Sequence, residues 1–127
     1  YIGVDDALFD ACYLIDLLAR ARRPFSHLVD DLPRTVSTPE LRIEVTEENK
    51  FTLVRDALEH FRDRYDVIDV DGVRVLFDGG WGLLRASNTQ PVIVARYEAD
   101  TQERLEEIRE EMESWLRGRG VAVPGVS

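Results

Sequence analysis

The chain has 127 residues, of which 44% are hydrophobic and 32% are charged, and its formal net charge at pH 7 is −9. This length suits one ordinary domain, or one small domain with part of another. The composition is that of a soluble globular protein and excludes a disordered chain. The excess of 25 acidic over 16 basic residues argues against nucleic-acid binding, which needs a basic surface. An anionic ligand would therefore need a local group of donors.

Residues 5–22 are predicted to form the first helix, capped by Asp5 or Asp6 and ended by Pro24. Apolar side chains cover most of its circumference, so we expect it to pack against a neighbour that lies upstream of this chain. The chain does not begin with Met, and we interpret it as a piece of a longer protein.

No segment is predicted to span a membrane or to be a signal peptide. The longest apolar stretch, residues 7–19, is interrupted by two aspartates and is too short to cross a bilayer. The N-terminus lacks a positively charged region followed by an apolar one. The only cysteine, Cys12, excludes an internal disulfide and is interpreted as a buried apolar residue. These features favour a cytoplasmic protein.

Residues 33–40 are predicted to be an extended connector, because Pro33 and Pro39 disfavour a helix. We place a hinge at residues 35–40. Residues 1–34 are then the helical end of a preceding domain, and residues 41–127 form a separate domain.

From residue 41 onward the pattern is strand, helix, four strands, helix. The expected strands are 41–45, 66–70, 73–77, 81–86 and 91–99, and the expected helices begin near Thr46 and at Asp100 or Thr101. Asp71-Gly72 is a strong hairpin signal. Strands joined by tight turns are antiparallel neighbours, and two helices with one apolar face each can cover a single side of the sheet. The predicted class is therefore α+β, with both helices on one face.

The apolar positions of these elements give the predicted core. Its members are Ile43, Val45, Phe51, Val54, Leu58, Phe61, Val75, Leu83, Val92, Val94, Leu105, Ile108, Met112 and Trp115.

A polar segment lies between the last two predicted strands. Within five residues it carries the guanidinium of Arg85, the hydroxyls of Ser87 and Thr89 and the carboxamide of Asn88. The planar fork of an arginine matches two oxygens of a phosphate, and hydroxyl groups can bind the remaining oxygens. A polar hairpin loop whose side chains bond their own backbone explains the same residues. The chemistry of the segment leaves both interpretations open.

The run from Arg85 to Pro91 (Arg-Ala-Ser-Asn-Thr-Gln-Pro), followed by Arg-Tyr-Glu-Ala at 96–99, resembles the phosphate-binding signature of the last domain of α-D-phosphohexomutases. Residues 37–40, 45–51, 71–75 and 80–83 resemble the hinge, the start of the first helix and the hairpins of that domain. Residues 1–34 are similar to the end of the preceding α/β domain. The resemblance implies a β-α-β4-α fold like half of the TATA-binding protein.

The resemblance also implies roles for single residues. The phosphate that is not transferred would be bound by Arg85, Ser87, Asn88 and Thr89. Supporting positions would be Trp81, Gly82, Gln90 and Arg96. No catalytic residue and no metal ligand is expected in this stretch, so the chain alone should be inactive.

The family transfers a phosphoryl group reversibly between the 6- and 1-positions of mannose or glucose phosphate through a 1,6-bisphosphate. The resemblance places its catalytic serine and its Mg²⁺ ligands in domains that precede this stretch, and those domains and the phosphosugar would be its partners. Two alternatives stay open. One is a stand-alone phosphosugar-binding regulatory module. The other is a phosphoglucosamine mutase, which Asn88 and Gln90 disfavour because that branch more usually carries Gly and Glu there.

Overall fold

The computed structural model describes residues 6–30 and 32–124. Contacts divide the chain into two units, Tyr1–Pro33 and Arg34–Ser127, which are described separately. The first unit contains α1 (Ala7–Ala21) and α2 (Phe25–Leu28). Asp6 caps α1 as predicted, because its carboxylate accepts a hydrogen bond from the backbone N–H of Phe9 at 3.0 Å.

The apolar side chains of α1 are exposed within this chain. Those of Leu8, Tyr13 and Ile15 are 62–81% accessible, and Cys12 is exposed as well. The predicted burial of Cys12 is therefore wrong for the described residues of the first unit, which leave every residue of α1 unburied. None of the helices in the described ranges is long and apolar enough to cross a membrane.

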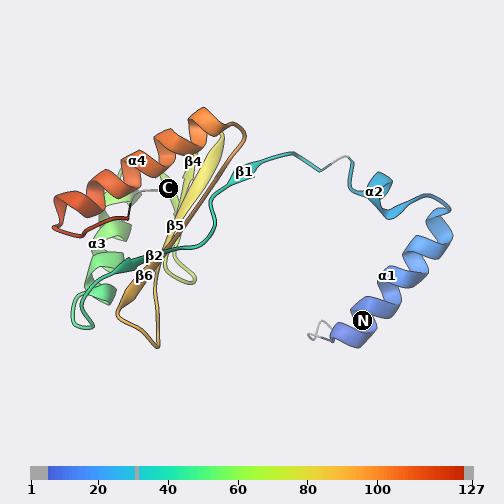
Figure 1. The fold of residues 1–127 in the computed structure, drawn as a ribbon, viewed down its shortest axis with the longest axis horizontal. Coiled ribbons are helices and arrows are strands. Elements are labelled where there is room, and N and C mark those ends of the chain that lie inside the picture. Colours follow the sequence, from blue (N-terminus) through green and yellow to red (C-terminus); the bar gives the residue numbers. More distant parts are fainter. Residues whose placement is uncertain (1–5, 31, 125–127) are drawn as a thin grey trace. The chain divides into compact units, whose positions relative to one another are not determined.

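The second unit is an antiparallel sheet with two helices (Figure 1). Its elements in the described residues are β1 (Val36–Ser37), β2 (Leu41–Glu44), α3 (Lys50–Arg62), β3 (Asp66–Ile68), β4 (Val73–Phe77), β5 (Gly80–Ala86), β6 (Val92–Ala99) and α4 (Gln102–Gly118). The strand order is β1-β6-β5-β4-β3, and β2 also pairs with β6. Both β1 and β2 thus lie along one edge of β6. The predicted α+β class and the antiparallel pairing of strands joined by tight turns are confirmed.

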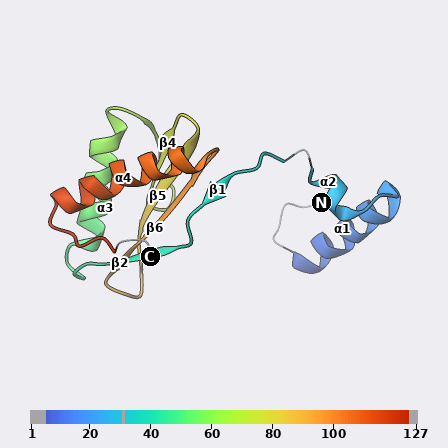
Figure 2. The same ribbon diagram turned by 45° about the horizontal axis from the view of Figure 1, so that its top comes forward.

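Both helices cover the same face of the sheet, as the two views in Figures 1 and 2 agree. Side chains from four strands, such as Ile43, Val75 and Tyr97, form one buried cluster with Phe61 of α3 and Met112 of α4. Successive residues of a strand point to opposite faces, so the alternate positions form the outer face, away from the helices. In β2, β4, β5 and β6 the outer-face residues are Arg42, Glu44, Arg74, Leu76, Trp81, Leu83, Arg85, Val92, Val94, Arg96 and Glu98.

Two residues predicted to lie in the core, Phe51 and Leu83, do not belong to it. Phe51 is 56% exposed, because α3 buries the stripe of Leu53, Ala57 and Phe61 together with Lys50. Lys50 is completely buried, with its ammonium paired to Glu47, and a hydrophobic pattern cannot show such a position.

In β5, Leu84 is fully buried and Leu83 is only half-buried on the outer face. Val92 and Val94 are buried as predicted, but they too lie on the outer face. Neighbouring apolar residues in a strand do not reveal which of them faces the core.

The predicted hinge overlaps the sheet. Val36 and Ser37 pair with Ala99 and Glu98 of β6. Thr38 is buried, and its hydroxyl accepts a hydrogen bond from the backbone N–H of Tyr97 at 3.1 Å. The hinge at 35–40 stays a prediction, and any pivot that keeps these bonds would lie before Val36.

Candidate functional site

The candidate site is built around the end of β5 and the loop that joins it to β6. Arg85 belongs to β5, opposite Val94 of β6, so regular strand pairing fixes its backbone. The N–H of Ser87 bonds the carbonyl of Val92 at 3.0 Å and closes the loop. The Ser87 hydroxyl accepts a long hydrogen bond, 3.4 Å, from the N–H of Thr89. A hydroxyl also has one donor, which this bond leaves available for a ligand.

A pocket of about 280 Å³ lies on the outer face beside this loop. Its lining residues are Glu40, Arg42, Asp71, Arg85, Ala86, Ser87, Asn88, Thr89, Gln90 and Val94. The structure therefore brings together the four residues predicted to bind phosphate, and Gln90 with them. Their role in binding stays a prediction.

The other three supporting positions do not line this pocket. The Trp81 ring stacks on the guanidinium of Arg74, with 4.0 Å between the ring centroid and Cζ. Gly82 is a packing position, because a Cβ atom there would overlap the sulfur of Met112. Arg96 pairs with Leu83 across the sheet, and its side chain forms no hydrogen bond or ion pair within residues 6–30 and 32–124.

Three charged lining residues were not found by sequence analysis. Arg42 and Glu40 come from the segment that leads into and through β2, and Asp71 comes from the turn between β3 and β4. Arg42 and Arg85 both pair with Val94, one from each side. This neighbourhood depends on the register of β2 against β6, and no local pattern in the sequence encodes it.

Gly72 brings Asp71 against Arg85. It adopts φ +88°, and a Cβ there would lie 2.9 Å from the Cα of Arg85. Only a glycine tolerates both the positive φ and the close approach. The turn can therefore pack on the end of β5, where the Asp71 carboxylate lies 3.2 Å from the Arg85 guanidinium.

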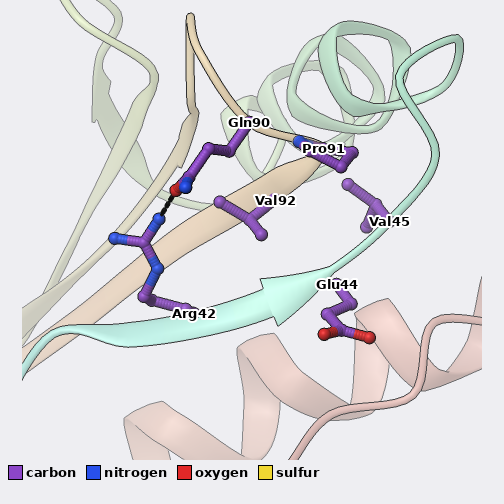
Figure 3. A pocket seen from close by; sticks show the side chains of 6 residues that line it. All are labelled: Arg42, Glu44, Val45, Gln90, Pro91 and Val92. Carbon is purple, nitrogen blue, oxygen red and sulfur yellow. Dashed lines mark hydrogen bonds between the residues drawn. The ribbon is translucent and has the colours of Figure 1, made fainter.

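The far end of the loop is held by Lys50 and Arg42. The ammonium of Lys50, whose side chain is 1% exposed, lies 2.6 Å from Glu47 and donates to the backbone carbonyl of Gln90 at 3.3 Å. The side-chain carbonyl of Gln90 accepts a hydrogen bond from Arg42 (Figure 3). A second hollow of about 730 Å³ lies beyond this bond, lined by Arg42, Gln90, Glu44 and Val45 among others.

The pocket offers donors that suit a phosphate group. Two guanidinium groups and the hydroxyls of Ser87 and Thr89 surround a space that also holds two carboxylates, Glu40 and Asp71. The arginine side chains remain 42–52% exposed, so a ligand can reach them from solvent. Ion pairs at such exposed positions contribute little free energy, and a doubly charged phosphate can therefore displace them.

Comparison with known proteins agrees with this geometry. Residues 40–114 match the family model described as phosphoglucomutase/phosphomannomutase, C-terminal domain. The chain belongs to this family. The matched range begins just before β2 and contains the entire pocket, so the phosphoglucomutase/phosphomannomutase C-terminal domain and the candidate site coincide.

Relatives of the chain carry names from the same family. It is 40% identical to a phosphomannomutase/phosphoglucomutase of Pseudomonas aeruginosa, over 98% of this chain and 27% of that protein. It is 38% identical to a probable phosphoglucosamine mutase of Methanopyrus kandleri, over 88% of this chain and 25% of that protein. A crystal structure of a phosphoglucomutase/phosphomannomutase family protein from Burkholderia thailandensis superposes with a TM-score of 0.78 at 35% identity, over 98% of this chain and 27% of that one. The chain thus spans about a quarter of the length of these relatives.

Proposed function

We propose that this chain is the phosphate-binding C-terminal part of a phosphohexomutase, and that it holds the substrate phosphate that is not being transferred. The observation that carries the proposal is the pocket in which Arg85, Ser87, Asn88 and Thr89 meet. The longer protein would interconvert the 6-phosphate and the 1-phosphate of mannose or glucose through a 1,6-bisphosphate. The sugar then binds in two opposite orientations. A clamp that recognises only the phosphate dianion serves both.

The residues of this chain hold the phosphate and do not break its bonds. Arg85 supplies a planar pair of N–H donors, and Ser87 and Thr89 supply hydroxyl groups at the loop. Within residues 6–30 and 32–124 no three metal-binding side chains gather at one place. The family's Mg²⁺ therefore does not fit the residues described here, and no step of this proposal runs through a metal held by them. We expect the chain alone to have no mutase activity.

The decisive test replaces Arg85 in the longer protein. A hydrogen bond to a charged partner contributes roughly 1.5–3 kcal/mol, so Arg85→Ala should lower kcat/KM by about 10- to 150-fold. The loss should be the same for mannose 1-phosphate and glucose 1-phosphate, because the clamp contacts phosphate and not the sugar. Arg85→Lys should recover only part of it, since an ammonium group keeps the charge but not the fork.

Arg74→Ala is the matched control, because Arg74 lies on the same face of the sheet, stacked on Trp81, but does not line the pocket. It should leave kcat/KM close to the wild-type value. A folded Arg85→Ala protein with unchanged kcat/KM, or with an altered sugar preference, would contradict the proposal.

A phosphoglucosamine mutase is the second candidate, and the similarity to the Methanopyrus kandleri protein favours it. Asn88 and Gln90 in the loop favour the hexose phosphates instead. Parallel assays of the longer protein with glucose, mannose and glucosamine phosphates separate the two, because the preferred substrate has the highest kcat/KM. A protein that binds these phosphosugars and interconverts none of them would be a regulatory module.

A further inference from the structure

A second guanidinium group faces the candidate phosphate pocket. Arg42 of β2 and Arg85 of β5 are both register partners of Val94 in β6, on opposite sides of it. Neighbouring strands lie about 4.8 Å apart, so the two arginine backbones are separated by roughly 10 Å. Both side chains leave the outer face and line the same pocket. Two long side chains at this spacing can converge on one small anion between them.

We propose that Arg42 is a second phosphate-binding arginine of this site, and that it leaves its contact with Gln90 to bind the ligand. The inference rests on the proposed function of the pocket, and it adds a residue that neither the family signature nor the sequence pattern contains.

The contacts that Arg42 makes now are replaceable. Its guanidinium donates to the side chain of Gln90 and lies 3.7 Å from the carboxylate of Glu40. The first acceptor is neutral, and the second is loose and half-exposed. A phosphate dianion offers charged oxygens in a bidentate arrangement, which bind an arginine more strongly than either. Arg85 and Asp71 form the same kind of displaceable pair on the other side of the pocket.

The charge balance of the pocket supports the need for two arginines. With Arg85 alone, the carboxylates of Glu40 and Asp71 would make the lining negative, in a chain whose net charge is already −9. Arg42 restores a neutral lining before the ligand arrives. When both arginines turn from their present acceptors to the phosphate, each of its two charges has a guanidinium group beside it, and the exposed carboxylates of Glu40 and Asp71 are left to water.

The test titrates the 127-residue chain with glucose 1-phosphate or with inorganic phosphate. The NMR signals of residues 87–90 report binding. Arg42→Ala should raise the dissociation constant for both probes by about 10-fold, the lower end of the range for a charged hydrogen bond, because Arg42 is half-exposed. Arg42→Lys should recover part of the loss. Arg74→Ala is the control, an outer-face arginine that does not line the pocket and was given no role in binding.

Gln90→Ala separates direct binding from a positioning role. If Arg42 binds phosphate itself, removing the Gln90 side chain frees the guanidinium, and any loss of affinity should be much smaller than that caused by Arg42→Ala. An equal loss for Gln90→Ala and Arg42→Ala would overturn the proposal, since Arg42 would then act only through the loop.

The two proposals fail in different ways. If Arg85→Ala abolishes binding and Arg42→Ala changes nothing, the second arginine is wrong and the phosphate clamp stands. If neither substitution affects binding of either probe, both are wrong. The thermal midpoint of each variant shows that it is folded, and Arg42→Gln serves as a second, less disruptive replacement if Arg42→Ala lowers it.

Discussion

The two faces of the sheet are made from alternate residues of the same strands, yet they differ in burial and in the kind of side chain they carry. On the helix-covered face, Val75, Leu84 and Tyr97 are completely buried against α3 and α4. On the outer face, the alternate positions of these strands carry arginines and a tryptophan. Arg42 and Arg85 form exposed ion pairs, and the guanidinium of Arg74 stacks on the ring of Trp81. One strand thus stabilises the fold with one set of residues and carries residues of the candidate site in the other. Substitutions one position apart should therefore change different properties.

The largest effect on stability is expected for Leu84→Ala. Leu84 is fully buried, and a cavity left by a buried leucine costs about 2–5 kcal/mol. Leu83→Ala is the matched control, because its side chain lies on the outer face and its loss should cost less than about 1 kcal/mol. Urea unfolding followed by circular dichroism measures both. Equal losses of unfolding free energy for Leu84→Ala and Leu83→Ala would show that the two faces do not differ in their contribution to stability.

Replacing Tyr97 should change the free energy of unfolding in the opposite direction. Its hydroxyl is buried on the helix-covered face and has no hydrogen-bond partner within the described residues. A buried unsatisfied polar group destabilises a protein, so Tyr97→Phe should raise the free energy of unfolding by about 1–2 kcal/mol. Tyr65→Phe is the control, since the Tyr65 hydroxyl donates to Glu111 at 2.6 Å. Its loss should lower the free energy by about 1 kcal/mol.

The same residue predicts a dependence on alkaline pH. Burial raises the pKa of the Tyr97 phenol above its ordinary value. A raised folded-state pKa gives stability that is complete below the unfolded-state pKa of about 10 and is lost as pH rises above it. The free energy of unfolding should fall as the pH rises above about 10, and fall less steeply in Tyr97→Phe. Identical slopes for the two proteins would rule out this contribution of Tyr97.

The smallest effect is expected on the outer face, at Asp71. Its carboxylate competes with phosphate for Arg85 at 3.2 Å. An exposed ion pair contributes up to about 1 kcal/mol, so Asp71→Asn should tighten binding of glucose 1-phosphate by at most about fivefold and hardly change stability. Asp69→Asn breaks a similar exposed pair, with Arg62 at 3.3 Å, outside the pocket. It should not affect binding. Weaker binding by Asp71→Asn would mean that the carboxylate orients Arg85 instead of competing for it.

Local signals in the sequence determined much of this protein. Period-two and helical patterns located the strands and both helices of the second unit, and Asp71-Gly72 marked a turn that the structure contains. The segment 85–91 was singled out by its resemblance to the signature of a family, because its chemistry alone left two interpretations open. The strand, helix and turn signals depend on residues that are close along the chain, so the propensity and spacing of those residues reveal them directly.

Only the tertiary structure decided which of two adjacent leucines, Leu83 or Leu84, faces the core, and that α3 turns Leu53 inward and Phe51 outward. It also decided that Arg42 and Asp71 meet Arg85, although they are distant in sequence. The physical reason is the same in each case. Pairing register and helix rotation are set by packing between segments far apart in the chain, and a strand with apolar residues on both faces leaves its own register open.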